Sequence, residues 1–405
     1  MDILFWLAIF SGLFMAWAVG ANDVANAMGT SVGSKVITIK QAILIAAIFE
    51  GLGALLASSG VTSTIRQDIV DVAYFQDNPI ILAKGMIAAL LASATWLMLA
   101  TQKGWPVSTT HSIVGAVLGF GLVSQGVQYI QWEKISAIAI SWLTTPIISA
   151  VIGSVIFKIV QKSVLMKPDP YKRAKMFFVF AMTSIVWGIA RVGLTAYQLD
   201  VWLIPVTTVC IAIAIVSIFY LSSTTESVLL TSYRQRCQGA EKVFGVLALA
   251  SACAMAFAHG ANDVANAIGP LASVIEILEY GILKTNSSFP FWITGLGAMG
   301  VVLGLAMFGY KIIASVGTKI TTLSPSRSFC AQLATAAVVL SASWLGYPVS
   351  TTHVLVGAVL GVGLARGFAA VNLSVVRGIF MSWAVTIPAG VFFSIGYFLL
   401  LKEFM

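Results

Sequence analysis

The chain has 405 residues, of which 59% are hydrophobic and 9% are charged, with a mean hydropathy of +0.96; soluble domains carry about 25% charged residues, so this composition excludes a soluble globular protein. Apolar stretches of about 20 residues recur along the whole length and predict an all-α polytopic membrane protein, because continuous apolar runs favour helices over a barrel. The net charge of +8 does not indicate a nucleic-acid partner, because the basic residues gather in short loops, as the positive-inside rule expects.

The first predicted span, residues 1–19, leads directly into residues 20–27, which read GANDVANA. The span lacks the basic segment of a cleavable signal, so we expect it to be retained. A carboxylate is costly in lipid, and we therefore expect Asp23 to face protein, water or an ion. Residues 28–34 are too small and too polar for a lipid-facing span and predict a broken or re-entrant helix buried in protein.

The rest of the first half alternates apolar spans with polar stretches. Residues 41–59 form the next span, which contains Glu50, and residues 61–79 are predicted to form a polar loop. Residues 80–101 and 135–160 are two further spans of this half.

A basic middle segment separates the two halves of the chain. Residues 158–175 carry six lysines and arginines against one acid, and residues 232–242 are also basic. Between them, residues 176–197 and 201–221 predict a helical hairpin, in which Arg191 is expected to be structural. Two spans return the chain to the same side, so both basic stretches should be cytoplasmic.

The second half repeats the motifs of the first. GANDVANA returns at residues 260–267, 240 residues after its first copy, and PVSTTH at residues 106–111 returns at 348–353, 242 residues later. Two shorter matches have offsets of 241 and 244 residues, so we infer that the whole half is duplicated. The chain therefore divides into a first repeat (1–160), a basic linker with the hairpin (161–240) and a second repeat (241–405).

Corresponding loops of the two repeats differ in charge. Loop 61–79 carries one basic residue and three acids, whereas its counterpart, 310–327, carries three basic residues and no acid. Because basic residues mark the cytoplasmic side, corresponding loops should lie on opposite sides of the membrane. This predicts two inverted-topology repeats in the cell membrane, with about twelve crossings and both termini outside, as in secondary transporters.

The PVSTTH motif predicts a helix that restarts inside the membrane. Proline disfavours helix in the residue before it, and a following serine is a natural N-cap. Free N–H groups and hydroxyls would then face the break, and two such ends could hold a tetrahedral oxyanion. Alternatively, the hydroxyls only satisfy the broken backbone. The candidate oxyanion-binding residues are Ser108, Thr109, Thr110, Ser350, Thr351 and Thr352.

The GANDVANA motif has different chemistry, because carboxylate and amide oxygens suit a hard cation. The alternative is that its amides only hold packed helices together. The candidate sodium ligands are Asn22, Asp23, Asn26, Asn262, Asp263 and Asn266. Glu50 has Thr294 as its counterpart and is either a further cation or proton site or a buried acid bonded to a neighbour.

Two histidines, His111 and His353, follow the hydroxyl motifs; they could bind an anion when protonated or orient the restarted helices. The four cysteines, at 210, 237, 253 and 330, lack metal or redox spacing and are expected to be small apolar fillers. No nucleotide-binding motif is present in the sequence, so transport driven directly by ATP is unsupported.

The duplicated GANDVANA and PVSTTH motifs resemble the inorganic phosphate transporter (PiT) family over residues 1–160 and 241–405. The resemblance implies uptake of inorganic phosphate by cation symport, with sodium in many members and protons in others, and no further cofactor. It also implies an elevator-type carrier that forms homodimers. When the resemblance is applied to the two motifs, it implies that cations bind to Asn22, Asp23, Asn262 and Asp263. It also implies that phosphate binds to the six serines and threonines named above.

Two other functions stay open at this stage. Some relatives carry sulfate, so the transported oxyanion could be sulfate. An anion channel is less favoured, because such pores are often lined with basic side chains and this chain places acids at its candidate site.

Overall fold

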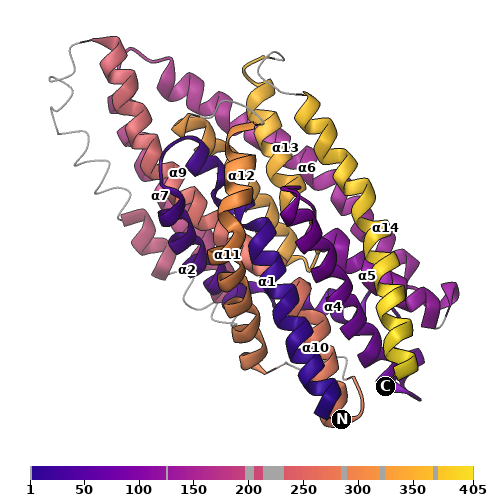
Figure 1. Cartoon of the computed structure of the whole chain (residues 1–405). Helices are drawn as coiled ribbons and strands as arrows, with labels where there is room; N and C mark the ends of the chain where they lie inside the picture. Colours follow the sequence, from indigo (N-terminus) through magenta and orange to yellow (C-terminus); the bar gives the residue numbers. More distant parts are fainter. Residues whose placement is uncertain are drawn as a thin grey trace.

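The protein is an all-helical bundle in the computed structural model, which describes residues 2–124, 126–196, 205–212, 232–283, 290–319, 324–367 and 373–404 (Figure 1). The described residues contain no strand beyond an isolated bridge between Val70 and Ile130. The principal helices are α1 (Asp2–Gly33), α2 (Ile39–Ala57), α3 (Ser59–Gln67), α4 (Pro79–Gln102), α5 (Thr109–Ser124), α6 (Trp132–Val160), α7 (Pro170–Ala196), α9 (Tyr233–Asp263), α10 (Ala265–Tyr280), α11 (Phe291–Lys319), α12 (Pro325–Trp344), α13 (Thr351–Leu364) and α14 (Leu373–Phe404).

Eight helical stretches of the described chain are long and apolar enough to cross a membrane, which agrees with a polytopic protein. The apolar helices α5 and α13 are shorter. The first arm of the predicted middle hairpin is α7, on which Arg191 stacks over the ring of Trp187. Most of the second arm, 201–221, lies outside the described residues. Twelve crossings therefore stay a prediction.

The predicted break after the first GANDVANA motif is wrong, because α1 continues as one helix through Gly33. The small polar side chains Thr30 and Ser31 are buried against other helices, so an unbroken helix meets no lipid there. The second copy does contain an interruption, a single turn at Val264 between α9 and α10.

The stretch 61–79, which is predicted to form a polar loop, is partly helical. Residues 61–67 belong to α3, which packs against the polar stretch 269–280 of α10. The buried Arg66 of α3 forms an ion pair with Glu276 of α10. Pairing of the two charges allows both polar stretches to fold into the protein interior.

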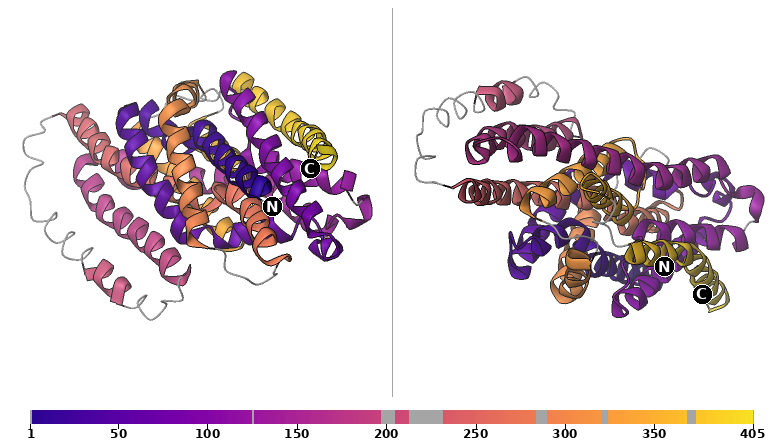
Figure 2. Two further views of the ribbon diagram at one scale, coloured as in Figure 1. Left: turned by 60° about the horizontal axis from the view of Figure 1, so that its bottom comes forward. Right: turned by 90° about the horizontal axis from the view of Figure 1, so that it is seen from above.

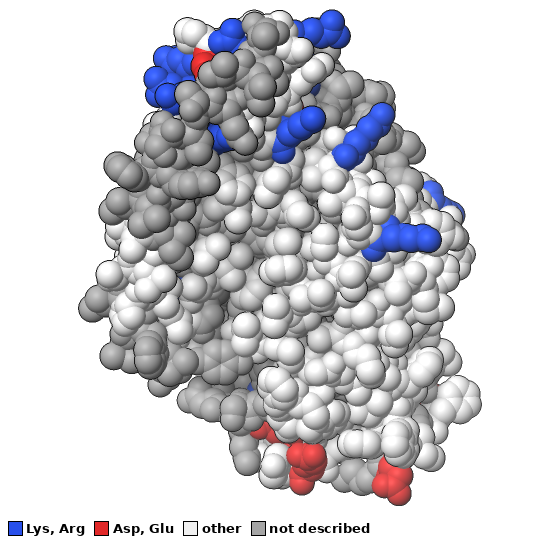
Figure 3. All heavy atoms as spheres, turned by 90° about the vertical axis from the view of Figure 1, so that its left-hand side faces the viewer, with Lys and Arg blue, Asp and Glu red and all other residues white. Residues whose placement is uncertain are grey.

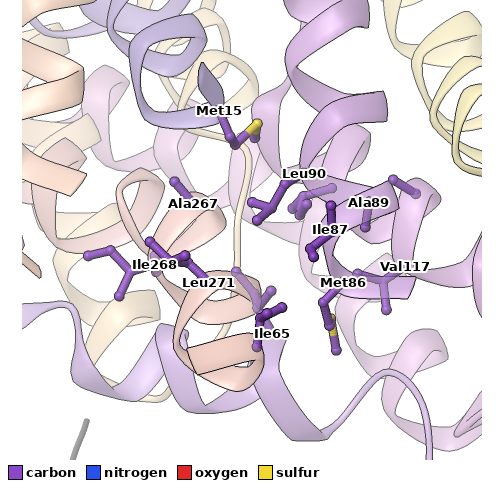
Figure 4. Close-up of a cluster of buried hydrophobic side chains, with 14 of the residues drawn as sticks. Met15, Ile65, Met86, Ile87, Ala89, Leu90, Val117, Ala267, Ile268 and Leu271 are labelled. Atoms are coloured by element: carbon purple, nitrogen blue, oxygen red, sulfur yellow. The ribbon is translucent and has the colours of Figure 1, made fainter. Parts of the chain in front are cut away.

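The hydrophobic core consists of two clusters at different heights along α1. The first packs residues 4–19 of α1 mainly against α3, α4, α5 and α10 (Figure 4). The second packs residues 25–37, around the end of α1, mainly against α2, α9, α12 and α13. The GANDVANA motif of α1 lies at the junction of the two clusters.

Helices of one half pack against helices of the other half. α1 lies on α11, and α9, which begins the second half, lies on α2. In the same way α5 lies on α14 and α13 lies on α6. These matched pairs are what a duplicated chain predicts, and they interlock the halves into one bundle, with α7 at its periphery (Figure 2). The boundaries at 160 and 241 stay a prediction.

Glycines permit the closest of these approaches. A Cβ at Gly260 of α9 would lie 2.0 Å from the carbonyl oxygen of Glu50, and one at Gly20 of α1 would lie 1.9 Å from that of Val301. Both glycines open a GANDVANA motif, so the motif brings its own helix against the backbone of another.

Candidate functional site

The two PVSTTH motifs restart helices, as the sequence predicts. Ser108 Oγ accepts a hydrogen bond from the N–H of His111 at 3.1 Å, and Ser350 Oγ accepts one from the N–H of His353 at 3.3 Å. α5 then begins at Thr109 and α13 at Thr351. The first N–H groups of both helices therefore lie outside the helical hydrogen bonding and face the centre of the bundle.

The first asparagine of each GANDVANA motif is bonded within its own half. Asn22 donates to the Thr101 hydroxyl at 2.9 Å, and Asn262 donates to the Ser343 hydroxyl at 2.9 Å. Each also donates to the carbonyl before the proline of its PVSTTH motif, at 3.2 and 3.3 Å. These bonds fix each GANDVANA motif beside the PVSTTH motif of the same half.

The second asparagine of each motif reaches into the other half. Asn26 donates to the hydroxyls of Thr351 and Thr352 at 3.3 and 2.8 Å. Asn266 donates to the corresponding pair of the first half, Thr109 and Thr110, at 3.3 and 3.4 Å. All four motifs therefore converge in one buried place, where Thr110 also donates to the carbonyl of residue 349 at 3.0 Å.

The two aspartates lie beside these hydroxyls, and both are buried. Thr351 donates to Asp263 Oδ2 at 2.6 Å, and Asp23 lies near the Thr109 hydroxyl without a well-formed hydrogen bond. Within the described residues, Asp263 Oδ1 and the side-chain carbonyls of Asn262 and Asn266 have no hydrogen-bond partner. Buried acceptors are costly without a partner, and an oxygen-only set of this kind fits a sodium ion.

His259, the residue before the second GANDVANA motif, is a site residue that the sequence reasoning missed. Its Nδ1 lies 3.1 Å from Glu50 Oε1 and its Nε2 lies 3.0 Å from Asp263 Oδ2. A neutral imidazole carries one N–H, so placing both nitrogens against carboxylate oxygens requires a second proton, on the ring or on a carboxylate. Asp23, His259 and Asp263 together offer three possible metal-ligand atoms within 4.8 Å of one another.

This cluster breaks the symmetry between the halves. The position that matches His259 in the first half holds Val19, and the position that matches Glu50 in the second half holds Thr294. The two unmatched residues contact each other across α2 and α9. Comparison of the residues that precede the two GANDVANA copies would have identified His259 from the sequence.

The remaining candidates have packing partners. The His111 and His353 rings meet edge to face with centroids 4.5 Å apart, and His111 also lies 3.9 Å from the Trp142 ring. This geometry agrees with a role in orienting the restarted helices. The four cysteines are free thiols.

Charge is unevenly balanced at the site. Three buried carboxylates, those of Asp23, Glu50 and Asp263, are accompanied by one imidazole, and none of the contacts described above involves a lysine or arginine. An anion could join this cluster only together with additional positive charge.

Comparisons with known proteins show which family the chain resembles. A model of the phosphate transporter family matches residues 19–394. A Haemophilus influenzae protein named among the phosphate permeases is 46% identical over 411 residues, covering 98% of this chain and 97% of the relative. The Arabidopsis thaliana protein "Inorganic phosphate transporter 2-1, chloroplastic" is 40% identical over 423 residues, covering 98% of this chain and 72% of the relative.

A solved structure described as "The sodium-dependent phosphate transporter" matches with a TM-score of 0.92 and 38% identity, and it covers 100% of both chains. Together, these matches extend over the motifs and over the complete helical bundle. The chain therefore belongs to the phosphate transporter family, whose members are transporters and not enzymes.

Proposed function

We propose that this protein imports inorganic phosphate by symport with sodium ions. The observation that carries the proposal is the meeting of two helix N-termini, six hydroxyls and two acidic motifs in one buried place, where the contacts described above involve no lysine or arginine. A site of this kind can hold an anion only when cations or protons accompany it.

Phosphate would bind between the starts of α5 and α13. The N–H groups at these helix ends and the hydroxyls of Ser108, Thr109 and Thr110, with their counterparts Ser350, Thr351 and Thr352, would surround its oxygens. The amides of Asn26 and Asn266 donate to the threonine oxygens. Thr351 donates its own proton to Asp263 and Thr110 donates to the carbonyl of residue 349, so an arriving phosphate would have to replace these two acceptors.

Sodium would bind to the oxygens of the GANDVANA motifs. The unpartnered acceptors on Asp263, Asn262 and Asn266 favour this assignment, and Asp23 supplies a second carboxylate. We assign Asn22 and Asn26 to the same shell through their side-chain oxygens. Glu50 reaches the site through His259, so a role as an additional cation ligand is secondary to its pairing with that imidazole.

The neutral donor set alone does not distinguish phosphate from sulfate. Phosphate, unlike sulfate, retains at least one O–H at neutral pH and can donate it to a buried acceptor. Asp23, whose two carboxylate oxygens have no hydrogen-bond partner within the described residues, would be such an acceptor, which favours phosphate.

The two core clusters support an inverted arrangement of the halves, because α4–α5 pack beside one end of α1 and α12–α13 beside the other. Such repeats permit alternating access around a fixed central site. The homodimer and the elevator movement that the family resemblance implies stay predictions.

Uptake into proteoliposomes tests the coupling ion, with the sodium and proton gradients imposed independently. We expect phosphate accumulation to follow an inward sodium gradient at equal pH on both sides. Accumulation that follows the proton gradient in the absence of sodium would show that protons, and not sodium ions, are the coupling ions. Excess sulfate should leave phosphate uptake unchanged.

A further inference from the structure

A groove at the end of the bundle where lysines and arginines gather lies outside the proposed transport site (Figure 3). It has a volume of about 660 Å³ and is formed by the segment after α1, the first turns of α9 and the start of α12. Three cationic side chains, those of Lys35, Arg234 and Lys242, line it together with a single acid, Glu241. The groove therefore has an excess of positive charge.

The acid does not pair directly with any of these three cations within the described residues. Glu241 Oε2 accepts the N–H of Ser326 at 2.9 Å and its Oε1 accepts the Ser326 hydroxyl at 2.8 Å, so its carboxylate is used to hold the first turn of α12. Within the described part of the chain, none of the three cations forms a salt bridge. The groove thus offers three basic groups to an external anion.

The lining changes from charged to apolar along α9. Arg234, Gln238, Lys242 and Val246 follow one another at four-residue intervals and so form one stripe of the helix. Leu249 continues the lining about 10 Å further along the axis than Lys242, at a rise of about 1.5 Å per residue. Val246 is 51% exposed, and the helix continues into a membrane-spanning stretch.

We propose that this groove binds one anionic phospholipid, with its phosphate headgroup between Lys35, Arg234 and Lys242 and its acyl chain along Val246 and Leu249. Free phosphate would match the charge but would leave the apolar part of the groove uncovered. A phospholipid matches both, and basic pockets between helices at a membrane surface recognise anionic headgroups in this way. The lipid would join the ends of α1 and α9, the two helices that carry the GANDVANA motifs.

Native mass spectrometry of the full chain, extracted from bilayers of phosphatidylglycerol and phosphatidylcholine, tests the proposal. The groove variant combines Lys35→Gln, Arg234→Gln and Lys242→Gln. The matched control combines Lys162→Gln, Lys167→Gln and Lys172→Gln, which removes three exposed charges near the same end but outside the groove. Thermal melting of each variant in detergent verifies that it is folded.

We expect the groove variant to lose about a hundredfold in affinity for retained phosphatidylglycerol, since each basic residue near an anionic surface contributes a factor of about five. The control should lose less than twofold. Equal losses in the two variants would overturn the proposal in favour of general surface attraction.

A second variant separates the lipid from a free anion. Val246→Asn keeps every cation but makes the apolar strip polar, so we expect it to lower lipid retention severalfold. Unchanged retention in this variant would show that the apolar strip does not hold an acyl chain, and complete displacement of phosphatidylglycerol by excess inorganic phosphate would show that the groove recognises only the phosphate group. Either result would overturn the lipid assignment.

Discussion

In each half, the hydroxyl of one threonine of the proposed phosphate site lies beside an aspartate of the proposed sodium site. Thr351 donates to Asp263 and accepts from Asn26, and Thr109 accepts from Asn266 beside Asp23. In the proposed function, this hydroxyl would turn from the carboxylate to an arriving anion while a bound cation takes its place at the carboxylate. These residues would then couple the cation site to the anion site.

Replacement of these hydroxyls tests that role. Thr109→Val and Thr351→Val keep the approximate volume, and each should weaken phosphate binding about ten- to a hundredfold, because a hydrogen bond to a charged group contributes about 1.5–3 kcal/mol. Thr335→Val is the matched control, since this buried threonine donates only to the Ala331 carbonyl of its own helix. Unchanged phosphate affinity in both site variants would make the hydroxyls structural only.

The aspartates should determine the dependence on sodium. Two like charges about 4 Å apart repel by about 4 kcal/mol at an effective dielectric constant of about 20, so phosphate beside Asp23 and Asp263 requires bound cations or protonated acids. We expect Asp23→Asn and Asp263→Asn each to reduce the increase in phosphate affinity that sodium produces. By linkage, phosphate should increase sodium affinity by the same factor that sodium increases phosphate affinity.

Phosphate titrations at several sodium concentrations, at constant pH and ionic strength, measure this effect. Asp77→Asn, on an exposed loop, serves as the control. If a site variant retains the full dependence of phosphate affinity on sodium, the aspartate that it replaces does not bind the cation.

His259 gives the second half a pairing that the first half lacks. His259→Val introduces the residue type found at the matching position, Val19, and leaves the buried Glu50 and Asp263 without their imidazole. Removing one member of a buried pair costs about 3–5 kcal/mol, so we expect a clearly lower melting temperature in detergent. Adding Glu50→Gln should restore part of the loss, whereas additive effects of the two changes would show that the residues are not coupled.

At the scale of elements, α3 and α10 depend on a buried ion pair between Arg66 and Glu276, whose side chains are 3% and 8% exposed. Arg66→Gln leaves a buried carboxylate unpaired and should destabilise the protein by about 3–5 kcal/mol, whereas Arg66→Gln with Glu276→Gln should cost less. The exposed pair of Lys134 and Asp68, at 3.7 Å, is the control, and Lys134→Gln should change stability by less than about 1 kcal/mol. Equal melting temperatures of Arg66→Gln and Lys134→Gln would contradict this account.

Local sequence predicts some of these elements and fails at others for a physical reason. Proline followed by serine fixes the restart of α5 and α13, because the backbone restriction and the N-cap are both local. The identical GANDVANA copies, in contrast, form a continuous helix in α1 and an interrupted one at Val264. Because the eight residues are the same in both copies, residues outside the motif decide its backbone.

The hydrogen bonds between the halves are harder to predict. The motif repeats imply that Asn26 and Asn266 lie near the centre, but not that each reaches the hydroxyls of the opposite half. That exchange depends on how the two halves interlock, which no local pattern in either half specifies. The same is true of Glu50 and His259, which are far apart in the chain and adjacent in the fold.

At the scale of the whole molecule, charge is distributed unevenly between the two ends of the bundle. Lysines and arginines gather at one end and acids at the other on the face shown in Figure 3, and both termini lie near the same end in Figure 1. The start of α12 lines the basic groove beside Lys35 and Arg234. The acidic loop before α4 contributes Val70 and Phe75 to the first core cluster, which lies at the other end of α1 from the basic groove.

Cysteine labelling of matched positions tests this orientation. Asp77 and Ser324 lie just before the prolines that begin α4 and α12, so inverted repeats place them on opposite sides of the membrane. In a background without the four native cysteines, we expect Asp77→Cys in intact cells to react with an impermeant maleimide. Ser324→Cys should react only after permeabilisation, as should Arg234→Cys, which marks the basic end. If Asp77→Cys and Ser324→Cys react from the same side, the two halves are parallel copies, and alternating access between inverted repeats loses its structural basis.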